Sequence, residues 1–327
     1  MRVRKDALSL TKDEKEAFIQ ALLRLKKQGR YDQYVHWHHH VMVPTVLPHE
    51  PRDALYRNGA HRGPSFLPWH REFLLQVEND LQNIDKAITL PFWDWTKDAA
   101  LSDPTKSPFW ADDFMGSNGV ESDNWRVATG PFAFAGGNWP IPVESDGPAL
   151  RRQFGVFINS LPTDADLKLA AREFLYDAPD YDCSPFTIGF RNRIEGWVTR
   201  RADHRVTTEG SQLHNRVHLW VGGSMAPMTS PNDPVFFLHH CFIDKVWADW
   251  QMAQRTANPD GSPHYAPMEN GPLGHNYKDV LKPWEHRVSD VMDISVLGYA
   301  YEAPPAVVPL DFVATPFAAE RSPFWAD

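Results

Sequence analysis

A histidine on the apolar face of a long predicted helix is the feature that most restricts how this chain can fold. Asp233 predicts the helix N-cap and Pro234 its first residue, and the helical pattern continues to about Gln254. His240 shares one face of this helix with four large apolar residues. These residues are Ile243, Val246, Trp247 and Trp250. Because a buried imidazole needs a hydrogen-bond partner or a metal ion, the core is expected to contain a polar site.

A second predicted helix carries His214 and His218. A spacing of four residues on a helix directs both imidazoles to the same side, as a shared metal ion requires. Taken alone, the pair is equally consistent with two surface histidines. Together with His240 it makes a candidate three-nitrogen site. His239 lies about a hundred degrees further round its helix and is expected to line the adjacent pocket.

A second trio of histidines is available in the first quarter of the chain. His70 lies on the buried side of a helix expected to begin near Pro68, and His61 precedes it. The third member comes from the run of histidines between 36 and 40, where neighbouring apolar residues predict a helical turn with His38 on its inner face. The other histidines of this run are expected at the pocket rim or on the surface. They are His36, His39 and His40.

The overall composition excludes several classes of function. The 327 residues are 42% hydrophobic and 23% charged, a globular composition. A net charge of −9 argues against nucleic-acid binding, which needs a concentrated basic surface. No apolar run approaches the roughly eighteen residues of a membrane span. With Cys183 and Cys241 as the only cysteines, a disulfide framework and a cysteine–zinc site are both disfavoured.

The helices favour an all-α domain. Thr11 and Glu14 form a capping-box pattern for a first helix, which Gly29 would end. With the helices described above, this pattern favours a four-helix-bundle core. The loop-like sequence from 91 to 211 adds a shell of long loops around that core.

The two ends of the chain give further expectations. The first residues lack the apolar core of a signal peptide, so we expect a cytoplasmic protein; export together with a partner protein stays open. The domain is expected to span residues 1–302. Residues 303–327 form a tail with several aromatic side chains, which we expect to pack on the body, either over the pocket entrance or on a remote face.

Four motifs, in this order, resemble those of the type 3 copper proteins, tyrosinases above all. They are Phe66-Leu-Pro-Trp-His70-Arg, Leu90-Pro-Phe-Trp-Asp-Trp95, Leu213-His-Asn-Arg-Val-His218 and Asn232-Asp-Pro-Val-Phe-Phe-Leu-His-His240. The likeness is strongest to compact bacterial tyrosinases and covers roughly residues 1–302. It implies an enzyme that ortho-hydroxylates monophenols with O2 and oxidises ortho-diphenols to quinones, as in melanin-type pigment formation.

The resemblance also implies two copper ions, each bound by three histidines. Copper A is implied at His38, His61 and His70, and copper B at His214, His218 and His240. Neutral imidazoles suit this role because they bind both Cu(I) and Cu(II). Some family members link a cysteine covalently to the middle histidine of copper A. Ala60 precedes that histidine here, so the thioether is absent.

Further residues are implied around the copper ions. A phenol must lose its proton to bind copper, although its unperturbed pKa is about 10. The resemblance implies that Glu195 and Asn215 hold the water that takes this proton. The alternatives are an ordinary ion pair of Glu195 with a neighbouring arginine, either Arg191 or Arg193, and a plain surface amide at Asn215.

The loop from 222 to 230 is implied to shape the entrance to the pocket. Pro227 and Met228 would present apolar contacts to the substrate ring beside copper B, and His239 could stack on that ring. The expected partners are a phenolic small molecule and a copper-delivering helper protein.

Four hypotheses follow for the function. The first is a tyrosinase, and the second is an oxidase restricted to catechols or ortho-aminophenols. The third is an O2 carrier like haemocyanin, which is disfavoured because such carriers are much longer or oligomeric chains with an extra domain over the site. The fourth is a zinc hydrolase, which is disfavoured because six histidines in two trios exceed the needs of a catalytic zinc ion.

Overall fold

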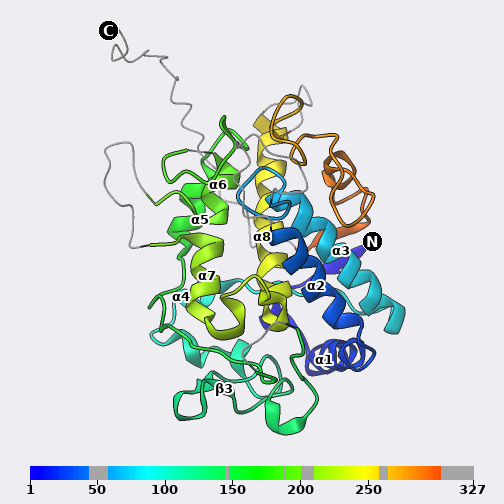
Figure 1. Ribbon diagram of the computed structural model, residues 1–327, viewed down its shortest axis with the longest axis vertical. Helices are drawn as coiled ribbons and strands as arrows, with labels where there is room; N and C mark the ends of the chain where they lie inside the picture. The colour runs from blue at the N-terminus through cyan, green and yellow to red at the C-terminus, as the bar shows by residue number, and fades with distance from the viewer. Residues whose placement is uncertain (44–57, 144–146, 188, 200–209, 258–263, 303–327) are drawn as a thin grey trace.

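The computed structural model of this chain describes residues 1–43, 58–143, 147–187, 189–199, 210–257 and 264–302. Helices form most of its regular structure (Figure 1). The named strands are few and short. β1 (Arg2–Arg4) pairs in parallel with β4 (Tyr299–Tyr301), and β2 (Gly119–Val120) pairs antiparallel with β3 (Arg126–Val127). The predicted all-α class is confirmed.

A glycine separates the first two helices. α1 (Lys12–Lys27) begins with the predicted capping box, in which the side chains of Thr11 and Glu14 accept hydrogen bonds from each other's backbone amides. Gly29 has a φ of 72°, a left-handed conformation that glycine adopts without steric cost, and it turns the chain into α2 (Arg30–Met42). The helical turn predicted for the histidine run is therefore a full helix.

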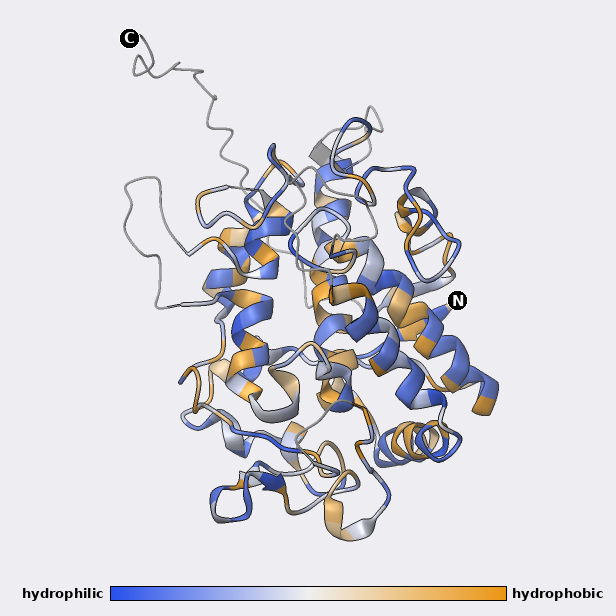
Figure 2. Cartoon of the chain, in the orientation of Figure 1, coloured by the Kyte–Doolittle hydropathy of each residue, from blue (hydrophilic) through white to orange (hydrophobic). Residues whose placement is uncertain are grey.

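Two long helices lie against each other at the centre of the molecule. α3 (Phe66–Ile84) packs on α8 (Val235–Ala257), α1 packs on both α2 and α3, and α7 (Leu213–Val221) contacts α8. Figure 2 shows that hydrophobic and hydrophilic residues share the surfaces of these helices, as expected for helices that bury one face. Helix α8 begins directly after the predicted Pro234. The bundle packing of four helices stays a prediction.

The core is rich in aromatic side chains. On α8, His240, Ile243, Trp247 and Trp250 are buried as their spacing predicts, whereas Val246 is only partly buried. Seven tryptophans are among the largest fully buried side chains. They are Trp69, Trp93, Trp95, Trp139, Trp220, Trp247 and Trp250. Large rigid rings bury much surface for little conformational entropy, so this core can hold a site rigidly.

Between α3 and α7 the chain follows a long path, as predicted, with only short helices. These are α4 (Trp95–Ala99), α5 (Asp164–Ala171), α6 (Phe190–Glu195) and several 3-10 turns. A buried ion pair ties this region to the start of α8. Arg152 Nε and Nη2 donate to the two carboxylate oxygens of Asp233 at 2.7 and 2.9 Å. Such bidentate geometry fixes orientation as well as distance.

The first and last strands are anchored to α8 through Asp244. Its Oδ1 accepts a hydrogen bond from Arg71 Nε at 2.6 Å, and its Oδ2 accepts from the hydroxyls of Tyr299 and Tyr301 at 2.6 and 2.5 Å. Arg4 Nη1 lies 3.3 Å from the same Oδ2. Burial alone would raise the pKa of Asp244, but Arg71, Arg4 and the two hydroxyls hold it below its usual value.

In the described part of the chain, no helix combines the length and the apolar character needed to cross a membrane. The predicted tail, residues 303–327, lies outside the described residues. The division at residue 302 therefore stays a prediction.

Replacing Asp244 by alanine should lower the free energy of unfolding by about 3–5 kcal/mol, because buried Arg71 would lose its carboxylate and Arg4 would keep only its ion pair with Glu78. Urea unfolding of the metal-free protein, followed by circular dichroism, measures this change. Asp249→Ala on the same helix is the control: its more exposed pair with Lys245 should contribute less than about 1 kcal/mol. Equal losses for the two variants would contradict the anchoring role of Asp244.

Candidate metal centre

The first histidine trio combines α2, α3 and the segment that precedes α3. His38 comes from α2, His70 from α3 and His61 from the loop between them, and all three side chains are buried. Their candidate ligand atoms lie within 4.8 Å of one another, and the Nε2 atoms of His38 and His61 are 3.2 Å apart. The structure thus brings together the three residues predicted for copper A.

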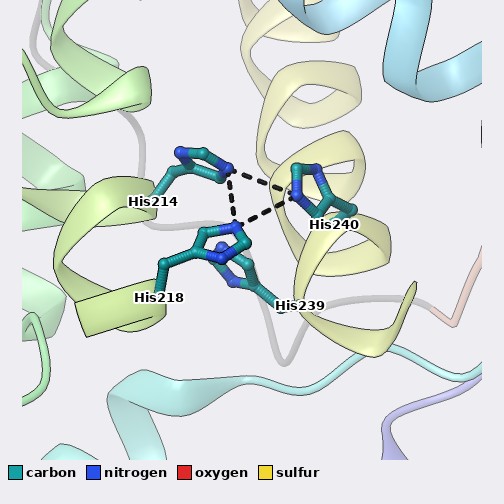
Figure 3. A group of neighbouring side chains, drawn as sticks. All are labelled: His214, His218, His239 and His240. Carbon is teal, nitrogen blue, oxygen red and sulfur yellow. Dashed lines mark hydrogen bonds between the residues drawn. The ribbon is translucent and has the colours of Figure 1, made fainter. Parts of the chain in front are cut away.

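The second trio combines α7 and α8. His214 and His218 lie one turn apart on α7 and face His240 on α8, as Figure 3 shows. The Nε2 atom of His214 lies 3.0 Å from that of His218 and 3.2 Å from that of His240, and the third distance is 3.3 Å. The structure thus also brings together the residues predicted for copper B.

Backbone carbonyls fix the orientation of several of these rings. His38 Nδ1 donates to the Met228 carbonyl at 2.7 Å and His70 Nδ1 to the Phe66 carbonyl at 2.8 Å. His218 Nδ1 donates in the same way to the Met225 carbonyl at 2.7 Å. A carbonyl can only accept, so the proton lies on Nδ1 in these rings, and Nε2 presents a lone pair.

His214 is held by its own neighbours. Its Nδ1 lies 3.0 Å from Asn215 Oδ1 and 3.3 Å from the Glu195 carbonyl oxygen, both of which accept. In contrast, His240 Nδ1 has no hydrogen-bond partner among the described residues. Its ring is held by packing instead, because Phe236 and His70 both lie 4.1 Å from it, centroid to centroid.

Lone pairs that converge in this way favour a cation at their focus. Burial, followed by the neighbouring histidines, lowers the pKa of His38, His70, His214 and His240 well below the usual value. Burial likewise lowers the pKa of His218 to about 4. These rings are therefore neutral near pH 7, and neutral nitrogens about 3 Å apart repel one another unless a metal ion lies between them. Metal–imidazole bonds of about 2.0–2.1 Å fit such spacings.

The two trios face each other across a short distance. The rings of His70 and His240 are stacked, with 4.1 Å between their centroids and 12° between their planes. The centroids of His61 and His214 are 5.5 Å apart. Two metal ions bound by these trios would be close neighbours, able to share a small molecule or a pair of electrons.

His239 lies beside the second trio. It is fully buried, and its ring stacks on that of His214 at 5.1 Å. One of its nitrogens lies within 4.8 Å of the candidate ligand atoms of that trio, but no dashed contact joins it to them in Figure 3. It packs on both His214 and His218 but is not among the described residues that line the cavity, so direct contact with a substrate ring stays a prediction.

A cavity of about 210 Å³ opens over both trios. Four of the six histidines line it, together with a largely apolar loop. The described residues that line it are His38, Met42, His61, Arg62, Trp197, Ser211, His214, Asn215, His218, Leu219, Ala226, Pro227, Met228 and Ser230. The predicted positions of Pro227, Met228 and Asn215 at the pocket agree with this lining. An aromatic ring would find apolar contacts here within reach of the histidines.

Glu195 is buried next to the first trio but does not line the cavity. Its Oε1 accepts from the Arg62 backbone amide at 2.7 Å and lies 3.5 Å from His61 Nδ1, and its Oε2 accepts from Arg191 Nη1 at 3.1 Å. The ion pair with Arg191 therefore exists beside the contact with His61. Arg193 pairs with Glu173 instead. Burial would raise the pKa of Glu195, but His61, Arg191 and the amide lower it below its usual value.

Some contacts could not be read from the sequence. The carbonyls of Met225 and Met228 orient one histidine of each trio, and a backbone atom leaves no residue-type signal. The absence of a thiol directly before His61, where Ala60 stands, could be read from the sequence. Cys241 lies in the core with its sulfur 3.6 Å from the Leu90 carbonyl.

Comparison with known proteins gives the family. Residues 28–253 match the family model described as the common central domain of tyrosinase, which spans more than half of the chain and all six histidines. The chain belongs to the tyrosinase family. Two copper ions are the cofactor of this family, and the two trios are where this chain can bind them.

Curated relatives agree with this family. A tyrosinase from Streptomyces glaucescens is 42% identical over 295 residues, which cover 90% of this chain and 96% of the relative. A tyrosinase from Streptomyces antibioticus is 44% identical and covers 87% of this chain and 93% of the relative. Grixazone synthase from Streptomyces griseus is 37% identical, with 90% of this chain and 97% of the relative covered.

Solved structures show the same fold. A polyphenol oxidase from Thermothelomyces thermophila aligns with a TM-score of 0.67 at 21% identity, over 93% of this chain and 89% of that chain. A functional unit of Octopus hemocyanin aligns with a TM-score of 0.56 at 19% identity, over 93% of this chain and 68% of that chain. At these identities the likeness describes the fold and not the activity.

Proposed function

We propose that this chain is a tyrosinase, which hydroxylates monophenols at the ortho position and oxidises ortho-diphenols to ortho-quinones with O2. The observation that carries the proposal is the pair of facing trios whose Nε2 lone pairs converge beneath an apolar cavity. Family membership and the tyrosinases at 42% and 44% identity support the same activity.

We assign copper A to the first trio and copper B to the second. The fit rests on the donor set: the buried Nε2 of His70 has no hydrogen-bond partner among the described residues, and the other Nε2 atoms meet only one another. Imidazole nitrogen is a good ligand for copper in both oxidation states. When bound, the two copper ions supply the binding site for O2 and the two-electron redox change. A single catalytic zinc would need one trio and an open position, and the second trio would then have no use.

The residues of this chain have three tasks around the copper ions. Pro227 and Met228 offer apolar contacts that orient the substrate ring in the cavity. The buried aromatic packing behind the trios excludes bulk water. The carbonyl contacts of Met225 and Met228 hold histidines in the tautomer that can bind metal.

Asn215 and Glu195 handle the proton of a monophenol in this proposal. Asn215 accepts from His214 through Oδ1, which leaves its Nδ2 group free of any partner among the described residues. Glu195 is an ionised carboxylate near pH 7. A water molecule that donates to Glu195 and accepts from Asn215 could take the phenolic proton, whose release at neutral pH needs such a base.

The relatives favour a tyrosinase over an oxidase restricted to catechols or ortho-aminophenols. The tyrosinases from Streptomyces are 42% and 44% identical, against 37% for grixazone synthase. Copper delivery by a helper protein is a further part of the proposal. Its test is whether the purified metal-free chain takes up two copper ions per molecule unaided.

Copper binding is tested by replacing two histidines of the same helix by alanine, one a proposed ligand and the other an exposed control. His38→Ala should remove one of two copper ions per chain and abolish turnover, because it takes one of three ligands from copper A. His36→Ala, at an exposed position of the same helix, should keep both ions and full activity. His240→Ala should remove the ion of the second trio. Mass spectrometry of bound metal and O2 uptake measure these outcomes; full activity with one copper ion, or with zinc, would exclude the proposal.

Proton transfer is tested by comparing tyramine with dopamine as substrates. Asn215→Ala and Glu195→Gln should lower the ratio of tyramine to dopamine turnover at least about tenfold, because general base catalysis contributes about a hundredfold or more to such steps. Asn79→Ala, an exposed amide on α3, should leave the ratio unchanged. Equal losses on both substrates would assign Asn215 and Glu195 a structural role. A wild-type chain that oxidises dopamine but never tyramine would instead be a diphenol oxidase.

A further inference from the structure

Arg62 carries the only permanent charge among the described residues that line the cavity. It directly follows His61, a member of the first trio. His61 is buried, with 6% of its surface exposed, whereas Arg62 is partly exposed, so the arginine is the more solvent-accessible of the two. A cation placed here meets whatever part of a substrate extends away from the reacting ring.

The backbone at Arg62 has a conformation that arginine rarely adopts. Its φ is 61°, in the left-handed region where glycine would be accommodated without steric cost. The Arg62 amide, which donates to Glu195 Oε1 at 2.7 Å, holds the chain in this conformation. Glycine would make the same hydrogen bond, since only the backbone takes part. An unfavourable backbone conformation kept for a long charged side chain indicates a use for that side chain.

The side chain has a defined position but no ion-pair partner among the described residues. Its Cζ lies 5.5 Å from the centroid of the Trp197 ring, which also lines the cavity. Among the described residues, no carboxylate forms an ion pair with the guanidinium. By contrast, the nearby Glu195 forms its ion pair with Arg191. Contact with an aromatic face holds a guanidinium in place and leaves the N–H groups at its edge available to an anion.

We propose that Arg62 is a specificity-determining residue that binds a carboxylate on the substrate side chain. The preferred substrates would then be phenols and catechols with a short acidic substituent opposite the reacting hydroxyl. This inference rests on the proposed tyrosinase activity and names the substrate class of the same site. The N–H groups of arginine match the two oxygens of a carboxylate, and the apolar loop accommodates the ring.

Three catechols with side chains of different charge test the proposal: dihydrocaffeate, 4-ethylcatechol and dopamine. Initial rates in the copper-loaded protein give kcat/KM for each, and the neutral 4-ethylcatechol is the reference. Arg62→Gln should lower the ratio of dihydrocaffeate to 4-ethylcatechol about fivefold, mainly through KM, as expected for one partly exposed ion pair. Arg62→Lys should restore part of the ratio, and Arg62→Glu should shift the preference to dopamine.

Two controls separate substrate recognition from other effects. Arg126→Gln removes a positive charge from an arginine that does not line the cavity and should keep the wild-type ratio. The difference between wild type and Arg62→Gln should also shrink between about 0.02 M and about 0.5 M salt, because the Debye length falls over that range.

Binding of 3-phenylpropionate, which has no hydroxyl to oxidise, gives a second measurement. Titration calorimetry should show about fivefold weaker binding to Arg62→Gln than to wild type, since the same ion pair is lost. A carboxylate that binds copper directly would bind both proteins equally, and that result would overturn the proposal.

Each failure has its own signature. Equal changes in kcat/KM on all three catechols would mean that Arg62 supports Glu195 and His61 and does not select substrates. A wild-type protein that oxidises none of the catechols would contradict the tyrosinase activity itself.

Discussion

The structure depends on hydrogen bonds from histidine Nδ1 to carbonyl oxygens. Each such bond fixes both the tautomer and the direction of a ring, so that the Nε2 lone pairs within each trio converge although the histidines come from separate elements. Without them, buried imidazoles could turn or exchange tautomers, and the converging lone pairs would be lost. The aromatic core then serves to keep these rings still, because a metal site loses affinity when its ligands are free to rotate.

The source of these carbonyls connects the metal centre to the substrate loop. Met225 and Met228 lie three residues apart in the loop after α7, and each orients one histidine, His218 in the second trio and His38 in the first. Two hydrogen bonds hold this loop to the neighbouring chain. The Arg151 amide donates to the Ser224 hydroxyl, and the Ser224 amide donates to the Arg151 carbonyl. One short segment therefore aligns both halves of the centre and also supplies the apolar wall of the cavity.

Much of the fold and of the metal centre could be predicted from the sequence, because helices and their caps leave local patterns. Helix spacing directed His214 and His218 to one side of their helix and put His240 on the apolar face of another, and the capping box at Thr11 located the first helix, because these signals are local. The apolar residues on one face of its helix distinguished His38 from the neighbouring histidines, and the family resemblance then implied its role as a copper ligand. The pairing of β1 with β4 and the network around Asp244 join residues that are far apart in the sequence, so no local pattern indicates them. The burial of His239 against His214 and His218 is likewise a property of packing.

Backbone atoms, and not side chains, orient His38 and Glu195 from the residues that face the cavity. A substitution at Pro227 or Met228 alters the wall that a substrate meets, yet the carbonyl of Met228 that orients His38 is present with any side chain. The same holds at Arg62, whose amide holds Glu195 while its side chain faces the cavity. Substrate preference can therefore vary by side-chain replacement without disturbing the metal ligands. A change in the length of the loop would instead move two histidines at once.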